Sequence, residues 1–221
     1  MYPIQSCIVI LDDADGRPKR RRTETVERLL DAALETFAEI GFAAASVEDI
    51  CRRGGFTRGA FYSSFRTKDE LFAALFARET ARNLARAEHQ LAGIEREADP
   101  VASAVERCLS TFRADRTWVL VLTEYRLHAA RHPEAAALLQ EHSAALRSRL
   151  TELIDVSSAR SGIRLAVPAA DLARIVVALH DGVVITQIPD ALPDDPATTA
   201  LERTALLLLL RAAVSEPAPT D

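Results

Sequence analysis

The chain has 221 residues, of which 48% are hydrophobic and only 5% aromatic, and its formal net charge is −5. This length suffices for a buried core in one or two domains, and a sequence dominated by Ala, Leu and Arg with almost no strand-like alternation predicts an all-α fold. The three widely spaced cysteines exclude a disulfide framework and a paired zinc motif, and the apolar run at 205–210 is too short to span a bilayer.

Charge is unevenly distributed along the chain. Residues 1–16 carry three acids and no base, whereas residues 17–68 carry eleven Lys or Arg against seven Asp or Glu. We therefore expect a polyanionic partner only at residues 17–68. Unpaired cysteines favour a reducing, cytoplasmic compartment. No positive charge precedes the apolar patch at residues 7–11, so we expect no signal peptide there.

Residues 1–22 are predicted to form a flexible tail that ends in the basic arm 17-RPKRRR-22, with Arg20, Arg21 and Arg22. Taken alone, such a run is usually a solvated charge cluster. The first helix is predicted from about Thr23 to Ile40, because apolar residues recur there at steps of three and four. Gly41 then stands where a left-handed C-terminal cap belongs.

Three closely spaced helix starts follow. Ser46 with Asp49 three residues later is typical of a capping box, and the Gly54–Gly55 pair permits a sharp turn. A short helix is predicted from Thr57 to about Phe65, and a second capping box starts a longer helix at residue 67 that extends to about residue 94. Two short helices joined by a tight glycine turn indicate a helix-turn-helix unit.

The spacing in the short helix separates a buried face from an exposed one. Phe61 and Phe65 are four residues apart and are expected to close a small core with Ile50, whereas Arg58 and Tyr62 share the opposite face. A guanidinium can donate two hydrogen bonds to a guanine edge in the major groove. Tyrosine hydroxyls and lysine ammonium groups donate to phosphate, and this predicts a double-stranded DNA partner.

The segment 46-SVEDICRRGGFTRGAFYSSFRTKDELF-72 resembles the DNA-binding domain of TetR/AcrR-type transcriptional regulators, and the likeness covers about residues 23–75. The resemblance rests on the order and spacing of Gly55, Tyr62, Phe65, Lys68 and Leu71. It implies DNA contacts at Ser46, Thr57, Arg58, Gly59, Tyr62, Lys68 and, as a possible addition, Ser63, with the basic arm in a minor groove or along phosphates. Gly54 replaces a common Ala and is expected to weaken its helix by ~1 kcal/mol.

Five more helices are predicted at residues 100–115, 117–131, 133–160, 168–188 and 196–214. We assign residues 23–80 to the DNA-binding domain, residues 81–214 to a ligand-binding and dimerisation domain, and residues 215–221 to a tail.

The last two predicted helices are apolar on more than one face. Five consecutive leucines at 206–210 surround a helix completely, so a single chain cannot bury all of them. We therefore predict a homodimer in which these helices form a four-helix bundle, as in the family that the chain resembles. The predicted interface residues are Leu172, Ile175, Leu179, Val183, Leu201, Leu208 and Leu209.

The middle helices place polar groups among apolar ones. Trp118, Tyr125 and His128 are candidates to line an effector cavity walled by Phe112, Leu122 and Leu138. The resemblance implies that a small molecule bound there changes the spacing of the DNA-binding domains. The alternative is that Trp118 and Tyr125 only pack the core, and that His128 faces solvent or a carboxylate.

The sequence thus predicts a ligand-responsive, dimeric transcriptional regulator, with repressor preferred over activator. The alternative is a helical small-molecule carrier with an incidental basic segment, which leaves the spacing of Arg58, Tyr62 and Lys68 unexplained. An enzyme is not expected, because no Ser/His/Asp order, GxSxG motif or P-loop occurs. We expect no cofactor, no metal and no membrane partner.

Overall fold

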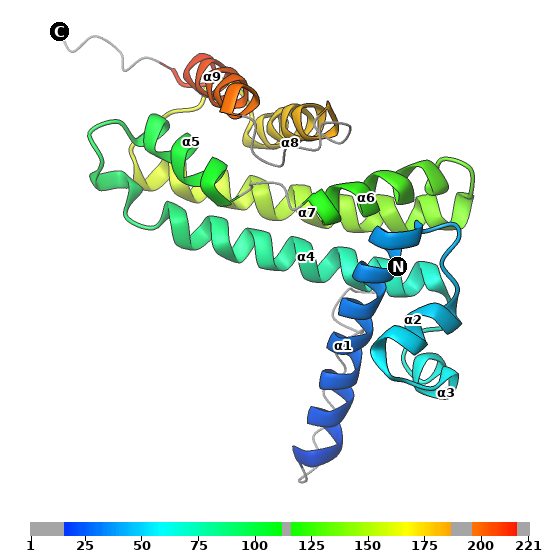
Figure 1. Cartoon of the computed structure of the whole chain (residues 1–221). Helices are drawn as coiled ribbons and strands as arrows, with labels where there is room; N and C mark the ends of the chain where they lie inside the picture. The colour runs from blue at the N-terminus through cyan, green and yellow to red at the C-terminus, as the bar shows by residue number, and fades with distance from the viewer. Residues whose placement is uncertain (1–15, 112–115, 187–195, 216–221) are drawn as a thin grey trace, which may run out of the picture.

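The computed structural model describes residues 16–111, 116–186 and 196–215, and within these ranges every long element is a helix (Figure 1), which confirms the predicted all-α fold. The elements in chain order are α1 (Gly16–Ile40), α2 (Val47–Gly54), α3 (Arg58–Tyr62), α4 (Lys68–Leu91), the short 3₁₀ helix η2 (Ile94–Arg96), α5 (Pro100–Thr111), α6 (Arg116–Ala129), α7 (Pro133–Arg160), α8 (Ala169–Thr186) and α9 (Pro196–Ala212). None of the helices in these ranges is long and apolar enough to cross a membrane.

Two long helices form the frame of the molecule. Figure 1 shows α4 and α7 side by side along the body, with α8 and α9 on the side of α7 away from α4. The small helices α2 and α3 lie near the start of α4, and α1 projects away from the body beside them (Figure 1). The N-terminal unit therefore hangs from one end of the frame.

Helix α1 begins earlier than the sequence predicted. It starts at Gly16 rather than Thr23, so the basic segment is helical and the predicted flexible arm is wrong for residues 16–22. Pro18 lies in the first turn, where a missing N–H costs nothing, and Arg and Lys favour helix. Arg22 is exposed, while the side chains of Arg20 and Arg21 lie outside the described residues.

The predicted caps of the helix-turn-helix are mostly confirmed. The Ser46 hydroxyl accepts the Asp49 N–H at 3.1 Å and the Asp49 carboxylate accepts the Ser46 N–H at 3.0 Å, which is a reciprocal capping box. Gly55 ends α2 with a φ of +71°, a conformation that favours glycine. The second box is incomplete, because the Glu70 carboxylate accepts the N–H of Arg66 and not that of Thr67.

Helix α3 is shorter than predicted, because it ends at Tyr62 and not near Phe65. After Tyr62 the chain tightens into a turn in which the N–H groups of Ser64 and Phe65 both bond to the Phe61 carbonyl. Phe65 is nonetheless buried beside Phe61, so the predicted packing of the two rings is confirmed.

One hydrophobic core runs from the N-terminal helices into the rest of the chain. Buried Phe37, Phe61 and Phe72 belong to the same cluster as Val121 and Tyr125 of α6. Ile40, the last residue of α1, is exposed and does not join this core. A second, smaller cluster joins α5 to α9 through Val105, Leu109 and Leu206.

The end of α9 is fixed by the loop between α7 and α8. The Ala166 N–H bonds to the Ala213 carbonyl at 2.8 Å, and the Ser215 N–H bonds to the Arg164 carbonyl at 2.8 Å. These two bonds hold the last helix against the body and define the wall that α9 contributes.

Gly54 has a packing reason that its sequence position did not indicate. A Cβ placed there would lie 2.9 Å from Cδ2 of Phe56 and 3.2 Å from Cβ of Ala32, so α2 approaches α1 through the missing side chain. The missing side chain therefore has a packing role in addition to its expected cost to the helix. A Cβ at Gly59, in contrast, would meet nothing closer than the Thr57 hydroxyl at 3.7 Å.

We expect Gly54→Ala to lower the free energy of unfolding by about 1–3 kcal/mol, because overpacking outweighs the better helix propensity of Ala. Gly59→Ala is the matched control and should leave stability unchanged or raise it by up to about 1 kcal/mol. Urea denaturation followed by circular dichroism measures both variants. A stabilised Gly54→Ala variant would show that the neighbouring rings move aside without cost.

Candidate nucleic-acid interface and internal cavity

Arg58 and Tyr62 form the exposed face of α3, as their spacing predicted. The Arg58 guanidinium carbon lies 5.8 Å from the centre of the Tyr62 ring, and Tyr62 is 49% exposed. Arg58 also pairs with Glu48 of α2 at 2.7 Å. Hydrogen bonding to Tyr62 and the Glu48 carboxylate raise the pKa of Arg58. Solvent screens an exposed pair of this kind, so Arg58 exchanges it readily for another acceptor.

The remaining small residues around α3 are exposed, and the side chains of two of them are already hydrogen-bonded to the backbone. The Thr57 hydroxyl accepts the Ala60 N–H at 3.2 Å, and the Ser63 hydroxyl donates to the Ala60 carbonyl at 2.7 Å. Gly59 lies between them with open space around its Cα. No packing within the described residues requires a glycine there, so the residue permits close approach of a molecule from outside.

Ser46 is less available than the sequence suggested. Its hydroxyl lies 2.5 Å from an Asp49 carboxylate oxygen, and its N–H is bonded to the same carboxylate. These bonds, together with Arg52, hold the pKa of Asp49 below its usual range. The N–H of Ser46 is therefore not a free donor for phosphate in this structure. Arg52 is exposed and paired with Asp49 at 2.6 Å.

Lys68 points inward, and this is the main correction at the predicted interface. Its ammonium donates to the Phe42 carbonyl at 2.5 Å and to the Ala45 carbonyl at 2.8 Å, and it lies 4.4 Å from the centre of the Phe42 ring. Burial lowers the pKa of Lys68. Because two of its three donors bind the loop before α2, Lys68 fixes that loop to the start of α4.

The N-terminal unit is joined to α6 by a polar junction. The Glu124 carboxylate accepts the Phe42 N–H at 2.7 Å. The Tyr125 hydroxyl donates to Asp69 at 3.1 Å, and Nε2 of His128 lies 3.1 Å from the same carboxylate oxygen. Burial and the Asp69 carboxylate raise the pKa of Tyr125, so its hydroxyl keeps the proton that it donates.

Tyr125 and His128 therefore do not line a cavity, although they were candidates. Tyr125 is fully buried and stacks on Phe72 with ring centres 3.6 Å apart, so the core alternative is correct for this residue. His128 faces a carboxylate, which was the other alternative. Leu138 also lies outside the cavity lining, and Phe112 lies outside the described residues.

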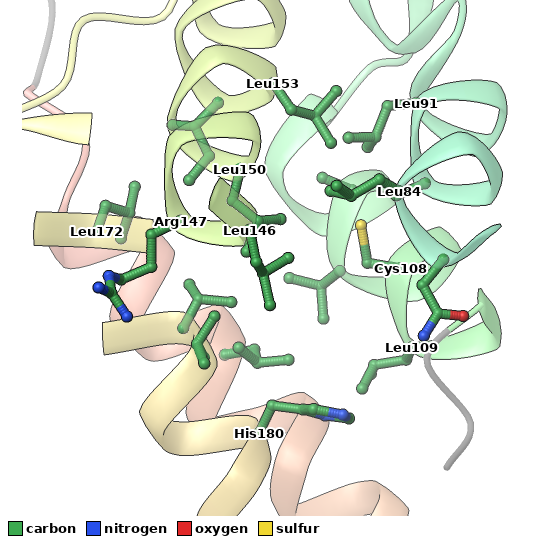
Figure 2. A pocket seen from close by; sticks show the side chains of 18 of the residues that line it. Leu84, Leu91, Cys108, Leu109, Leu146, Arg147, Leu150, Leu153, Leu172 and His180 are labelled. Carbon is green, nitrogen blue, oxygen red and sulfur yellow. The ribbon is translucent and has the colours of Figure 1, made fainter. Parts of the chain in front are cut away.

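A cavity of about 550 Å³ nevertheless lies between α4, α5, α6, α7, α8 and α9. Trp118 and Leu122, two of the predicted residues, contribute to its wall. Figure 2 shows that the wall is rich in leucine, with Leu84 and Leu91 facing Leu150 and Leu153. Sequence reasoning missed most of the lining because it is assembled from six separate helices. The volume lies in the range of about 300–1,000 Å³ typical of small-molecule sites.

Polar groups line the cavity where α6, α8 and α9 meet. Arg126 of α6 pairs with Asp181 of α8 at 2.7 Å. His180 of α8 lies 2.8 Å from Glu202 of α9, a carboxylate that is only 8% exposed. The Thr123 hydroxyl is buried in the wall and has no hydrogen-bond partner among the described residues.

Cys108 is the one cysteine in the cavity wall. Burial raises the pKa of its thiol to about 11, so the thiol is protonated at neutral pH and behaves as a small apolar group. Cys51 is likewise buried, as a small hydrophobic residue of α2. Neither thiol is activated by its surroundings.

The predicted interface residues of α8 and α9 divide into three groups. Leu172 is buried in the protein's own interior, and Leu179 packs against the cluster of α5 and α9, so these two are not free for a partner. Val183 and Leu209 are half-buried. Ile175, Leu201 and Leu208 are 45%, 63% and 67% exposed, which is unusual for large apolar side chains and leaves them as an uncovered apolar face.

Two family models match the chain. Residues 29–75 match the model described as bacterial regulatory proteins of the tetR family, and residues 97–210 match the model described as the C-terminal part of BetI-type transcriptional repressors. The first match contains α2, α3 and the start of α4, and the second contains the cavity-lining residues of α5 to α9 and the exposed apolar residues of α8 and α9.

Similar proteins are regulators as well. An HTH-type transcriptional regulator of Mycobacterium tuberculosis strain H37Rv is 37% identical over 91 residues, 40% of this chain, and the chain spans only 47% of that relative. The HTH-type regulator UidR of Escherichia coli K12 is 27% identical over 72% of this chain and 80% of its own. The FadR regulator of Bacillus subtilis, solved with stearoyl-CoA, has a TM-score of 0.65 and 20% identity over 83% of this chain and 96% of its own, a likeness of fold alone.

The position of Lys68 leads to a prediction that differs from a phosphate contact. Lys68→Met keeps the apolar stem but removes the donor from two backbone carbonyls, and we expect it to lower the free energy of unfolding by about 1–3 kcal/mol. Arg66→Met changes a neighbouring exposed residue, and its free energy of unfolding should stay within about 0.5 kcal/mol of that of the parent. Thermal and urea unfolding check both variants. Unchanged stability together with a flatter salt dependence of DNA affinity would restore the phosphate role.

Proposed function

The chain belongs to the TetR family of bacterial transcriptional regulators, and from this membership we propose that it is a homodimeric, cytoplasmic repressor released from its operator by a small molecule. The observation that carries the proposal is the exposed Arg58–Tyr62 pair on α3, beside a glycine that nothing within the described residues requires. These groups would enter the major groove, where Arg58 reads a guanine edge and Tyr62 donates to a phosphate.

A dimer would supply the second recognition helix. The exposed apolar side chains of Ile175, Leu201 and Leu208 support pairing of α8 and α9 with the same helices of a second copy. Two copies related by a two-fold axis present two α3 helices to half-sites about one DNA turn apart. The operator is then expected to be an inverted repeat.

The cavity supports the effector part of the proposal. Its size fits a small molecule, and α6 connects it to the N-terminal unit. One side of α6 lines the cavity through Trp118 and Leu122, and another holds the polar junction through Glu124 and Tyr125. A ligand that binds the DNA-free arrangement of α6 more tightly than the DNA-bound arrangement would weaken DNA binding, and DNA would weaken ligand binding by the same factor.

The carrier alternative loses its support, because the segment that it treated as incidental matches the family's DNA-binding model. Family membership likewise makes the chain a regulator and not an enzyme. Fluorescence anisotropy with a fragment upstream of its own gene, at two salt concentrations and against a scrambled fragment, tests the proposal. Equal, salt-sensitive binding to both fragments contradicts sequence-specific recognition of that fragment.

Arg58→Ala should weaken binding to the operator by about 1–3 kcal/mol while binding to scrambled DNA changes little, since the lost contact is to a base. Arg52→Ala is the matched control, because Arg52 is exposed on α2 and already paired with Asp49. The measurement is the ratio of operator to scrambled affinity at one salt concentration. An equal loss on both DNAs for Arg58→Ala would reject the base-reading role.

Leu208→Glu should split the homodimer, because it places a charge in a face that a second copy would bury. Leu127→Glu is the control, since Leu127 is a leucine with a similar exposure of 55% that belongs to α6 and not to α8 or α9. Multi-angle light scattering gives the mass of each variant. A dimeric Leu208→Glu protein, or a monomeric parent, would contradict the proposed interface.

A further inference from the structure

The cavity has an end rich in leucine and a polar end, and the two ends come from different helices. The apolar end is formed by side chains of α4 and α7, with Leu84 and Leu91 facing Leu150 and Leu153 (Figure 2). The polar end lies on α6, α8 and α9 and contains the Arg126–Asp181 and His180–Glu202 pairs. In Figure 2, His180 lies well away from Leu91 and Leu153, with Cys108 between them. Such a lining suits an amphipathic molecule.

The charge of the polar end limits what that molecule carries. Arg126 is matched by Asp181, and Glu202 is matched only by His180. With a neutral imidazole the four groups carry one net negative charge, and with a protonated imidazole they are neutral. Among the described residues, this end therefore holds no uncompensated positive charge in either state. A carboxylate or phosphate placed there would face two acids, Asp181 and the buried Glu202, and like charges repel each other.

Two oxygen atoms at this end can instead accept a hydrogen bond from a donor on the molecule. The Glu202 carboxylate is nine-tenths buried, and a carboxylate has more acceptor sites than one imidazole uses. The buried Thr123 hydroxyl has no partner within the described part of the chain. A buried hydroxyl left unpaired is costly, so a polar atom that reaches it contributes to affinity.

The other charged residues of the lining lie on α4 and α7, outside the polar end. Glu79 is held by Arg78 and Arg82 of its own helix, and the exposed Arg86 bonds to the Arg82 carbonyl and to the Asn83 side-chain oxygen. Arg147 is exposed, and in Figure 2 its guanidinium is directed to the side, away from Leu84 and Cys108. An anionic group could meet Arg147 only at the rim, and that possibility is tested below.

We infer that the effector is a non-anionic amphiphile, with an apolar body between α4 and α7 and a hydrogen-bond-donating hydroxyl or amine directed at Glu202 and Thr123. This inference deepens the proposed function and rests on its effector site. It predicts that ligands of equal chain length bind the cavity with affinities that depend on their head group. An amine is favoured most, because it also pairs with the carboxylate, and an alcohol follows.

The test compares decylamine, decanol and decanoate, which differ only in the head group. Trp118 is the only tryptophan of the chain and lines the cavity, so its emission reports occupancy. We expect saturable changes with decylamine and decanol and at least about tenfold weaker binding of decanoate, which corresponds to about 1.4 kcal/mol. Equal or tighter binding of decanoate, or no binding of any of the three, would overturn the inference.

Variants separate the two ends of the cavity. Glu202→Gln should remove most of the preference for decylamine over decanoate, whereas Glu134→Gln, an exposed acid at the start of α7, should keep it. Thr123→Val is isosteric and should weaken the binding of decanol several-fold while the protein remains folded. If Arg147→Gln abolished decanoate binding while Glu202→Gln left the preference for decylamine over decanoate unchanged, the head group would lie at the rim beside Arg147. That result would refute the assignment.

The outcome is independent of DNA binding. Ligand affinity is read from Trp118, and operator affinity from anisotropy of a labelled duplex in a separate titration. If decylamine binds with the expected selectivity but leaves operator affinity unchanged, the cavity assignment stands and the effector role of the proposed function fails. If the operator is not bound at all, the proposed function fails and the ligand result is unaffected.

Discussion

The carboxylate of Asp69 is the contact on which the arrangement of the molecule depends. It stands at the start of α4, accepts a hydrogen bond from the Tyr125 hydroxyl and lies beside Nε2 of His128. Glu124, which precedes Tyr125 on α6, accepts the Phe42 N–H. Beneath these bonds Phe42 and Phe72 pack against the Tyr125 ring. Because polar and apolar contacts coincide there, the N-terminal unit and α6 cannot move independently without leaving buried groups unpaired.

Helix α6 both lines the cavity and holds the N-terminal unit. Thr123 and Arg126 line the cavity, and Glu124 and Tyr125 hold the N-terminal unit, so neighbouring residues serve opposite faces. Helical geometry requires this division, because each successive residue points about 100° further around the axis. A ligand at the polar end of the cavity would therefore lie within one residue of the groups that position the loop before α2. Coupling over such a short path needs only a small displacement of α6.

Sequence reasoning succeeded where partners are close in the chain. The caps at Ser46 and Gly55 and the exposed Arg58–Tyr62 face depend on residues one to four positions apart, and all were predicted. It failed where partners are distant. Lys68 points inward because its acceptors lie 23 and 26 residues earlier. Tyr125 is held by an acid 56 residues away. Local periodicity contains no information about such pairs, nor about a cavity assembled from six helices.

The helical start of α1 also decides how its basic residues can meet DNA. An α-helix with side chains is about 10–12 Å across, whereas the minor groove of B-DNA is only about 6 Å wide. Arg20, Arg21 and Arg22 belong to such a helix, and Figure 1 shows that it projects away from the body on the side of α2 and α3. A helix of this width follows the phosphates and does not enter the minor groove. These arginines would therefore add affinity and salt dependence, and the reading of sequence would fall to α3.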